Sequence, residues 1–327
     1  MPATSPLRAW LEQRPPAAGA AVMATGIVSV GLHLAGHEPL SRVVLVLACA
    51  AWTALAADFA VRLLRDRSQW TAEAETPGAL TAVAATTVLG TRFSALGWQT
   101  LAEALLTLSV VMWPWLLVLV LRHCGRRMPG SVFLCCVATE GLAVLAAALA
   151  KAVTTAWLAH AALVAFWLGL ALYVFALSRF DPRQVVEGRG DHWVAGGALA
   201  ISALAGARLI DANSARLYLW NADDSGVLRT ATIVLVVLDV CWYVVLLACE
   251  VARPRLGYDV RRWSTVFPMG MSTAAMLSVA TALHYPWLKV PGQVLLWIAV
   301  AAWLAVAAGA VADARAGVAA LRSTAPR

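Results

Sequence analysis

Four ionisable side chains lie inside stretches of the sequence that are otherwise largely apolar. They are Arg92, Glu140, Arg208 and Asp239. Ionisable groups are costly in apolar segments and by default mark functional sites. We take the two arginines as candidates for attracting anions. The two acids are candidates for pairing with these arginines, which would neutralise buried charge, or for coupling a process to protons.

A second chemical feature is the stretch STVFPMGMS at residues 264–272, inside a long apolar run. Pro268 lacks an amide hydrogen and disfavours helical backbone at Phe267 before it, while Gly270 permits close approach or a further bend. A helix with such a weak point is tolerated at membrane depth where it faces protein or a watery cavity. The stretch therefore predicts a special role for this segment.

Catalytic signatures are absent. The sequence contains no HExxH, GxSxG or GxxxxGK[ST] motif and no GxGxxG followed by an acidic residue at Rossmann spacing. Its six cysteines form no CxxC pair, which argues against a disulfide framework or a zinc site. An integral-membrane enzyme would need a convergent catalytic cluster, so we expect no enzyme, no cofactor and no metal.

The elements that position these residues follow from composition. The chain is 61% hydrophobic and 13% charged, whereas soluble domains are roughly a quarter charged. Apolar runs separated by polar or Pro/Gly-rich breaks predict ten membrane-spanning helices. Their predicted ranges are 17–35, 42–61, 78–96, 99–121, 130–150, 155–178, 192–210, 227–251, 263–283 and 292–312. We expect an all-α integral membrane protein with a transmembrane domain at 17–312 and cytoplasmic tails at 1–16 and 313–327.

The distribution of basic residues supports this topology. With both termini inside, eighteen of the 25 Lys and Arg residues lie in inner segments and five in outer connections, with two in spans. The net charge of +7 is thus mostly a topology signal, and we expect no nucleic-acid partner. The predicted localisation is the cell membrane, with many spans.

A repeat occurs in the odd-numbered spans. Each carries a helix-weakening residue, in most cases beside a polar or aromatic one, at steps of about two spans, which predicts five helical hairpins in series. These positions are Thr25-Gly26, Gly90-Thr91, Glu140-Gly141, Gly206, and Phe267-Pro268 with Gly270. The alternative is that glycine merely allows close helix packing. We expect the five weakened helices to surround a central pore, with these residues kinking or lining it.

Four stretches resemble one known family in order along the chain. They are VMATGIVSVG (22–31), AATTVLGTRF (84–93), DHWVAGGALAISALAGARLI (191–210) and WSTVFPMGMSTAA (263–275). The chain resembles the tellurite-resistance/dicarboxylate transporter family, which includes plant guard-cell slow anion channels and fungal malate permeases. The resemblance implies five hairpins around a pore, commonly in a homotrimer. It also implies that Phe267, an aromatic of the ninth span, plugs that pore.

The predicted function is transport of a small anion across the lipid bilayer. The substrate could be a C4-dicarboxylate such as malate, an inorganic anion, or an oxyanion linked to tellurite resistance. A proton-coupled dicarboxylate permease, with Glu140 or Asp239 as the coupling group, is one alternative to a passive channel. A membrane sensor without transport is another.

Overall fold

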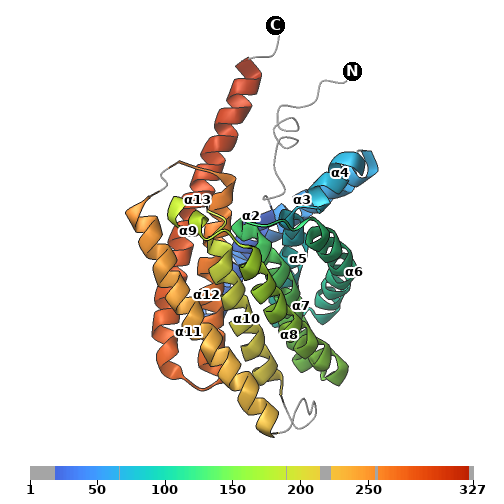
Figure 1. Cartoon of the computed structure of the whole chain (residues 1–327), viewed down its shortest axis with the longest axis vertical. Coiled ribbons are helices and arrows are strands. Elements are labelled where there is room, and N and C mark those ends of the chain that lie inside the picture. Colours follow the sequence, from blue (N-terminus) through green and yellow to red (C-terminus); the bar gives the residue numbers. More distant parts are fainter. Residues whose placement is uncertain (1–18, 66, 189, 214–221, 255–256, 324–327) are drawn as a thin grey trace.

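The computed structural model describes residues 19–65, 67–188, 190–213, 222–254 and 257–323 (Figure 1). Within these ranges the regular structure is helical, apart from an isolated bridge between Met128 and Phe180. The long helices are α2 (Gly19–Leu34), α3 (Glu38–Arg65), α5 (Thr81–Ala95), α6 (Gln99–His123), α7 (Leu134–Val153), α8 (Ala156–Arg179), α10 (Trp193–Ala212), α11 (Ala222–Ala252), α12 (Trp263–Ala282) and α13 (Lys289–Ser323). Short helices are α4 (Arg67–Ala74), α9 (Arg183–Glu187), η2 (Pro77–Leu80), η3 (Gly130–Phe133), η4 (Val260–Arg262) and η5 (Pro286–Leu288).

Each of the ten predicted segments falls on one of the long helices. Among the described residues, eight helices are long and apolar enough to cross a membrane. The other two, α2 and α5, have 16 and 15 residues in the described part of the chain, which is less than a full span. The all-helical, multi-span membrane class is confirmed, while the count of ten crossings stays a prediction. The predicted tail at 313–327 begins as a continuation of α13, which runs to Ser323. The tail at 1–16 lies outside the described residues.

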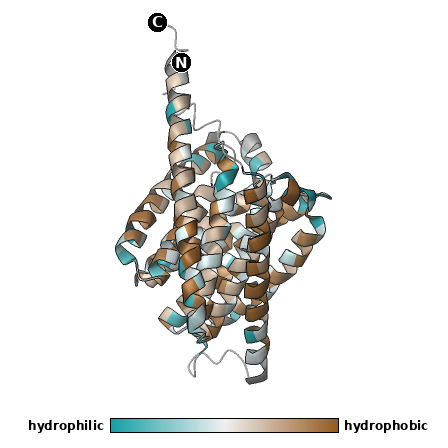
Figure 2. Cartoon of the chain, turned by 90° about the vertical axis from the view of Figure 1, so that its left-hand side faces the viewer, coloured by the Kyte–Doolittle hydropathy of each residue, from teal (hydrophilic) through white to brown (hydrophobic). Residues whose placement is uncertain are grey.

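The long helices form an inner and an outer layer. In the spans of α7, α10 and α12, 94%, 89% and 89% of the residues in the most apolar 18-residue stretch are buried. The helices α2 and α5 also bury most of their residues. The same fraction is much lower in the other five long helices. It is 17% in α3, 33% in α6, 28% in α8, 33% in α11 and 11% in α13. Hydrophobic residues run along these outer helices, while hydrophilic ones gather toward the two ends of the molecule (Figure 2). This layering matches the sequence pattern, because the segments carrying the glycines and polar residues are the buried ones.

The inner helices form a closed ring. Contacts connect α2 with α5, α5 with α7, α7 with α10, α10 with α12, and α12 again with α2. Each inner helix also packs against the outer helix that follows it in the chain, giving the pairs α2/α3, α5/α6, α7/α8, α10/α11 and α12/α13. We call the contact between one pair and the next a seam. The ring therefore has five seams.

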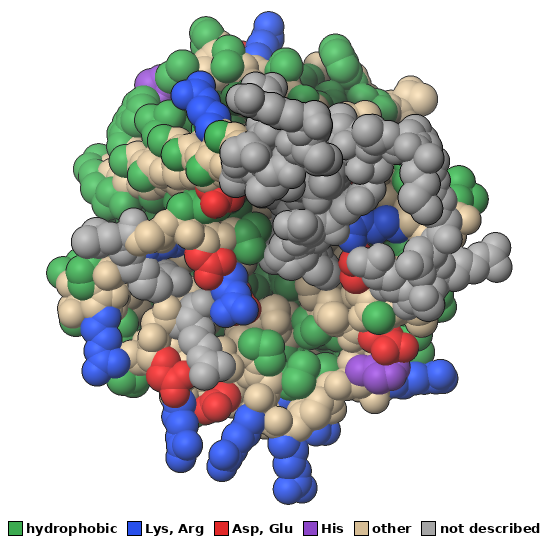
Figure 3. Space-filling model, turned by 90° about the horizontal axis from the view of Figure 1, so that it is seen from above, with side chains coloured by type: hydrophobic (Ala, Val, Ile, Leu, Met, Phe, Trp, Pro, Cys, Tyr) green, Lys and Arg blue, Asp and Glu red, His purple; other side chains and the backbone are tan. Residues whose placement is uncertain are grey.

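The turns inside the first two pairs depend on glycine. Gly36, between α2 and α3, has φ +85°, and Gly97, between α5 and α6, has φ +84°. Residues with a side chain rarely adopt this left-handed backbone conformation, whereas glycine adopts it without steric cost because it has no Cβ. Seen from the end of the molecule where α4 and the last turns of α13 lie, Lys and Arg side chains project along the rim (Figure 3).

Candidate functional site

Phe267 is buried where α12 packs against α10. The helix α12 continues through Pro268, and Phe267 is only 1% exposed. A Cβ added to Gly197 of α10 would lie 3.3 Å from Cε1 of Phe267 and 2.9 Å from Cγ of Pro268. The aromatic ring is therefore packed against the backbone of α10. Gly197 makes this approach possible because it has no side chain.

The five predicted weak-point glycines all lie at helix contacts. A Cβ at any of them would come within 3.0 Å of a neighbouring side chain, and the helices are continuous through each. The contacts are Gly26 with Val88, Gly90 with Leu145, Gly141 with Thr87, Gly206 with Thr232, and Gly270 with Ile27. In this conformation the glycines serve close packing, the alternative that the sequence left open. Thr91 is buried and donates to the carbonyl of Thr87 at 2.9 Å.

Three seams are joined by the same kind of hydrogen bond. An indole N–H from the outer helix of one pair donates to a threonine hydroxyl on the inner helix of the next pair. The bonds are Trp52 to Thr86 at 2.9 Å, Trp113 to Thr139 at 2.9 Å, and Trp303 to Thr25 at 3.0 Å. Each threonine in turn lies within hydrogen-bonding distance of a carbonyl one helical turn earlier. Thr25, predicted to line a pore, thus faces the outer helix α13.

The two remaining seams carry the two buried acids instead. Ser202 of α10 donates to Oε1 of Glu140 on α7 at 3.0 Å, and Ser272 of α12 donates to Oδ1 of Asp239 on α11 at 2.9 Å. Gly169 of α8 leaves room for the Glu140 side chain, because a Cβ there would lie 2.7 Å from Cγ of Glu140. The α10/α11 pair is therefore bounded on both sides by a carboxyl group, whereas the other seams are closed by tryptophan.

Pairing of these acids with the arginines, one of the two alternatives left open by the sequence, is not present among the described residues. Glu140 is 0% exposed and Asp239 is 2% exposed, and neither forms an ion pair with a residue that the structure describes. Oε2 of Glu140 has no hydrogen-bond partner in the described part of the chain. The acids lie on α7 and α11 at the seams, and one oxygen of each accepts a hydrogen bond from a serine hydroxyl.

Arg92 has a different partner, Glu38 at the start of α3. Its side chain is 0% exposed, its Nη2 lies 2.7 Å from Oε1 of Glu38, and its Nε donates to Ser41 at 2.9 Å. Glu38 also contacts Arg42 at 2.9 Å and His33 at 2.7 Å. One carboxylate thus faces three basic side chains at the end of α2 and α5. Nη1 of Arg92 keeps a buried N–H without an acceptor among the described residues.

Arg208 lies at the corresponding end of α10. Its Nε is buried and has no hydrogen-bond acceptor among the residues that the structure describes. Nearby, Lys151 and Asp211 form an ion pair at 2.8 Å that connects the ends of α7 and α10. Among the described residues, no group of three or more His, Cys, Asp or Glu is arranged to hold a metal ion.

Sequence reasoning missed the three seam tryptophans, Glu38, Gly169 and Gly197. The tryptophans did leave a signal, because Trp52, Trp113 and Trp303 stand well inside even-numbered spans rather than at their ends. Tryptophan in membrane proteins is enriched at the interfaces. An indole placed deeper needs an acceptor for its N–H, and threonines on the neighbouring helices supply it.

These features define a multi-pass helical membrane protein with a buried ring of five helices and a sheath of five more exposed ones. The family model "SLAC1: Voltage-dependent anion channel" matches residues 13–311, so the chain belongs to this family of anion channels. The resemblance stated from the four sequence stretches is thereby confirmed.

Two curated relatives are the uncharacterized membrane proteins MT1776 and Rv1735c of Mycobacterium tuberculosis. Each is 32% identical to this chain over 117 residues, which is 34% of this chain. The match spans 58% of the length of each relative. Their names support a membrane location.

Proposed function

We propose that the chain conducts small anions along the axis of the inner ring and that Phe267 is the constriction. The carrying observation is the closed ring in which Phe267 is fully buried against Gly197, in a chain that belongs to an anion-channel family. Anion movement then requires the ring of Phe267 to leave this position. Small and hydroxyl-bearing side chains of the inner helices would solvate a passing anion without holding it tightly.

In this proposal all ten long helices cross the bilayer as five hairpins, with both termini cytoplasmic and the transmembrane domain at 17–312. The short helices α2 and α5 are surrounded by protein, and α5 is extended by η2, so neither needs to meet the full hydrocarbon thickness alone. The substrate would be a C4-dicarboxylate such as malate or an inorganic anion or oxyanion, including a tellurite-related one. A homotrimer is the proposed assembly.

Arg208 and the unpartnered N–H of Arg92 would attract the anion electrostatically. Arg92 acts with less than a full charge, because Glu38 lies 2.7 Å away. In this proposal, the residues predicted to kink the helices or line the pore take that role in the open conformation. They are Thr25, Gly26, Gly90, Thr91, Gly141, Gly206, Pro268 and Gly270. In the closed one their contacts are those of helix packing.

Liposome reconstitution tests the gate. Phe267→Ala should raise the anion-dependent current or malate uptake several-fold over the wild type, because it removes the ring from the constriction. Phe166→Ala is the matched control: Phe166 is 0% exposed but lies on the outer helix α8. Equal flux in wild type and Phe267→Ala, with both folded, would refute the gate. A similar rise in both variants would assign the effect to general loosening.

A second candidate, proton-coupled transport, is favoured by one observation. The two buried carboxyl groups bound the α10/α11 pair on both sides, and Phe267 packs against that same pair through Gly197. A proton gained or lost at Glu140 or Asp239 would alter a seam next to the gate. An imposed pH gradient should then drive uptake in the wild type, and Glu140→Gln or Asp239→Asn should reduce that response. If the flux does not depend on the pH gradient in any of the three proteins, transport is not coupled to protons. If no flux is observed at all, the result favours a membrane sensor without transport.

A further inference from the structure

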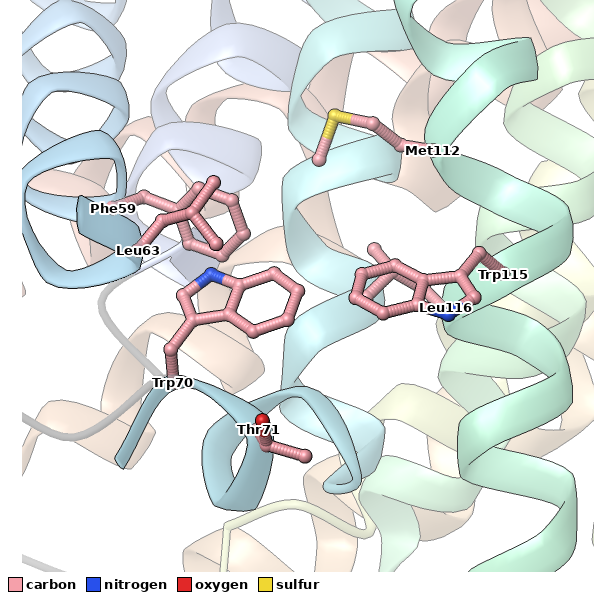
Figure 4. A pocket seen from close by; sticks show the side chains of 7 residues that line it. All are labelled: Phe59, Leu63, Trp70, Thr71, Met112, Trp115 and Leu116. Carbon is pink, nitrogen blue, oxygen red and sulfur yellow. The ribbon is translucent and has the colours of Figure 1, made fainter. Parts of the chain in front are cut away.

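An apolar groove lies on the outer surface between α3, α4 and α6, away from the inner ring. Its volume is about 460 Å³. The residues that line it are Phe59, Leu63, Trp70, Thr71, Met112, Trp115 and Leu116 (Figure 4). Trp70 stacks on Trp115 with ring centroids 4.9 Å apart and contacts Phe59 edge-on at 5.5 Å. Six of the seven lining side chains are thus hydrophobic.

The groove opens toward the surface that meets lipid. The spans of α3 and α6 are mostly unburied, and Trp115 is 50% and Leu63 38% exposed. Charged residues lie next to lining residues along α3 and α4: Arg62 pairs with Asp58 at 2.8 Å and with Glu73 at 2.7 Å. Tryptophan beside such charges is typical of the membrane interface. The groove therefore lies near the boundary between acyl chains and headgroups.

An occupant of this groove must be thin, flexible and apolar. Water does not fill apolar cavities, and a volume of about 460 Å³ has room for only about one turn of a helix, which is about 10 Å across. In a bilayer, acyl chains would lie along the exposed apolar residues of α3 and α6. We propose that the groove binds the acyl chain of a phospholipid.

The headgroup preference follows from the residue that lies two turns beyond Trp115. Arg122 is seven residues after Trp115, so both lie on the same face of α6, about 10 Å apart along the axis. Arg122 is exposed, as are Arg126 and Arg127 just after the helix. His123 lies 3.7 Å from Glu75 and connects this end of α6 with the chain that follows α4. A basic cluster next to an apolar groove fits an anionic headgroup such as phosphatidylglycerol.

Native mass spectrometry of the purified full chain tests the site, using phosphatidylglycerol and phosphatidylcholine as probes. We expect the wild type to retain one phosphatidylglycerol per chain. Leu63→Trp, which fills the groove, and Arg122→Gln, which removes the charge, should each lower retention about tenfold. Trp157→Ala is the control, since Trp157 is 67% exposed on α8 and lines no part of this groove. It should retain the lipid as the wild type does.

Three outcomes would overturn the proposal. Equal retention in Leu63→Trp and wild type would show that lipid binds elsewhere. Equal retention of phosphatidylcholine would remove the headgroup preference. An oligomer without bound lipid that dissociates in Leu63→Trp would assign the groove to a second copy. None of these measurements depends on anion flux, so the lipid site and the proposed function can fail separately.

Discussion

Gly169→Ala provides a sharp test of where Glu140 lies. A methyl group at this position of α8 would lie 2.6 Å from Cδ and 2.7 Å from Cγ of Glu140, which is far inside contact distance. Glu140 is 0% exposed, so its carboxyl group cannot swing into solvent. Any shift also disturbs its 3.0 Å hydrogen bond with Ser202.

The expected cost combines three effects. Overpacking a core costs ~1–3 kcal/mol, and a lost hydrogen bond adds ~1 kcal/mol. Alanine offsets up to ~1 kcal/mol through its better helix propensity. We expect Gly169→Ala to lower the free energy of unfolding by ~1–3 kcal/mol, because the first two effects outweigh the third.

Unfolding in mixed micelles of increasing denaturing-detergent fraction measures this change. Gly226→Ala is the matched control: Gly226 is also in a helix, α11, and a Cβ there meets nothing within 4 Å. It should be neutral or more stable by up to ~1 kcal/mol.

A double variant then isolates the contact. Glu140→Ala removes the side chain that clashes, so Gly169→Ala should cost at least ~1 kcal/mol less in that background than alone. If Gly169→Ala behaves like Gly226→Ala, or if its effect is additive with Glu140→Ala, Glu140 does not occupy the seam between α7, α8 and α10.

Two further changes address the tryptophan seams and the charge on Arg92. Trp113→Phe should lower the free energy of unfolding by ~1–2 kcal/mol, because it removes the indole hydrogen bond to Thr139. Trp157→Phe, on the exposed surface, should change the free energy of unfolding by less than ~0.5 kcal/mol. Equal effects of the two variants in the unfolding assay would contradict a seam role for Trp113. Glu38→Gln removes the carboxylate 2.7 Å from Arg92, so Arg92 would attract the anion with its full positive charge. The anion concentration that gives half-maximal flux in liposomes should then fall. If this concentration is unchanged, Arg92 does not attract the anion.

Much of the architecture could be predicted from the sequence. The ten apolar segments all fall on helices, and the odd-numbered ones form the buried layer. The physical reason is local: a helix that faces lipid must present an apolar surface to it, while a helix surrounded by protein tolerates glycine, serine and threonine along its length. The stretch around Pro268 singled out this part of the ninth span, and the family resemblance made Phe267 the candidate gate; the residue is buried, and its role stays a prediction.

The partners of the ionisable residues could not be predicted in the same way. One alternative paired Arg92 with an acid inside the spans, but Arg92 contacts Glu38, which lies in the connection between the first two predicted spans. This contact could not be predicted because the chain turns at Gly36 and α3 then begins beside the end of α5, a distance that no sequence spacing reports. Glu140 and Asp239 instead contact serines on neighbouring helices.

The sequence by itself determined that this is a multi-span helical membrane chain, which segments face protein, and which family it resembles. These properties follow from hydrophobicity and residue size along each segment, without reference to other segments. Only the tertiary structure decided that tryptophan closes three seams and a buried acid each of the other two. Such pairings depend on the rotation and height of each helix relative to its neighbours. These are set by close packing around the whole ring, and a change of one helical turn would exchange every partner.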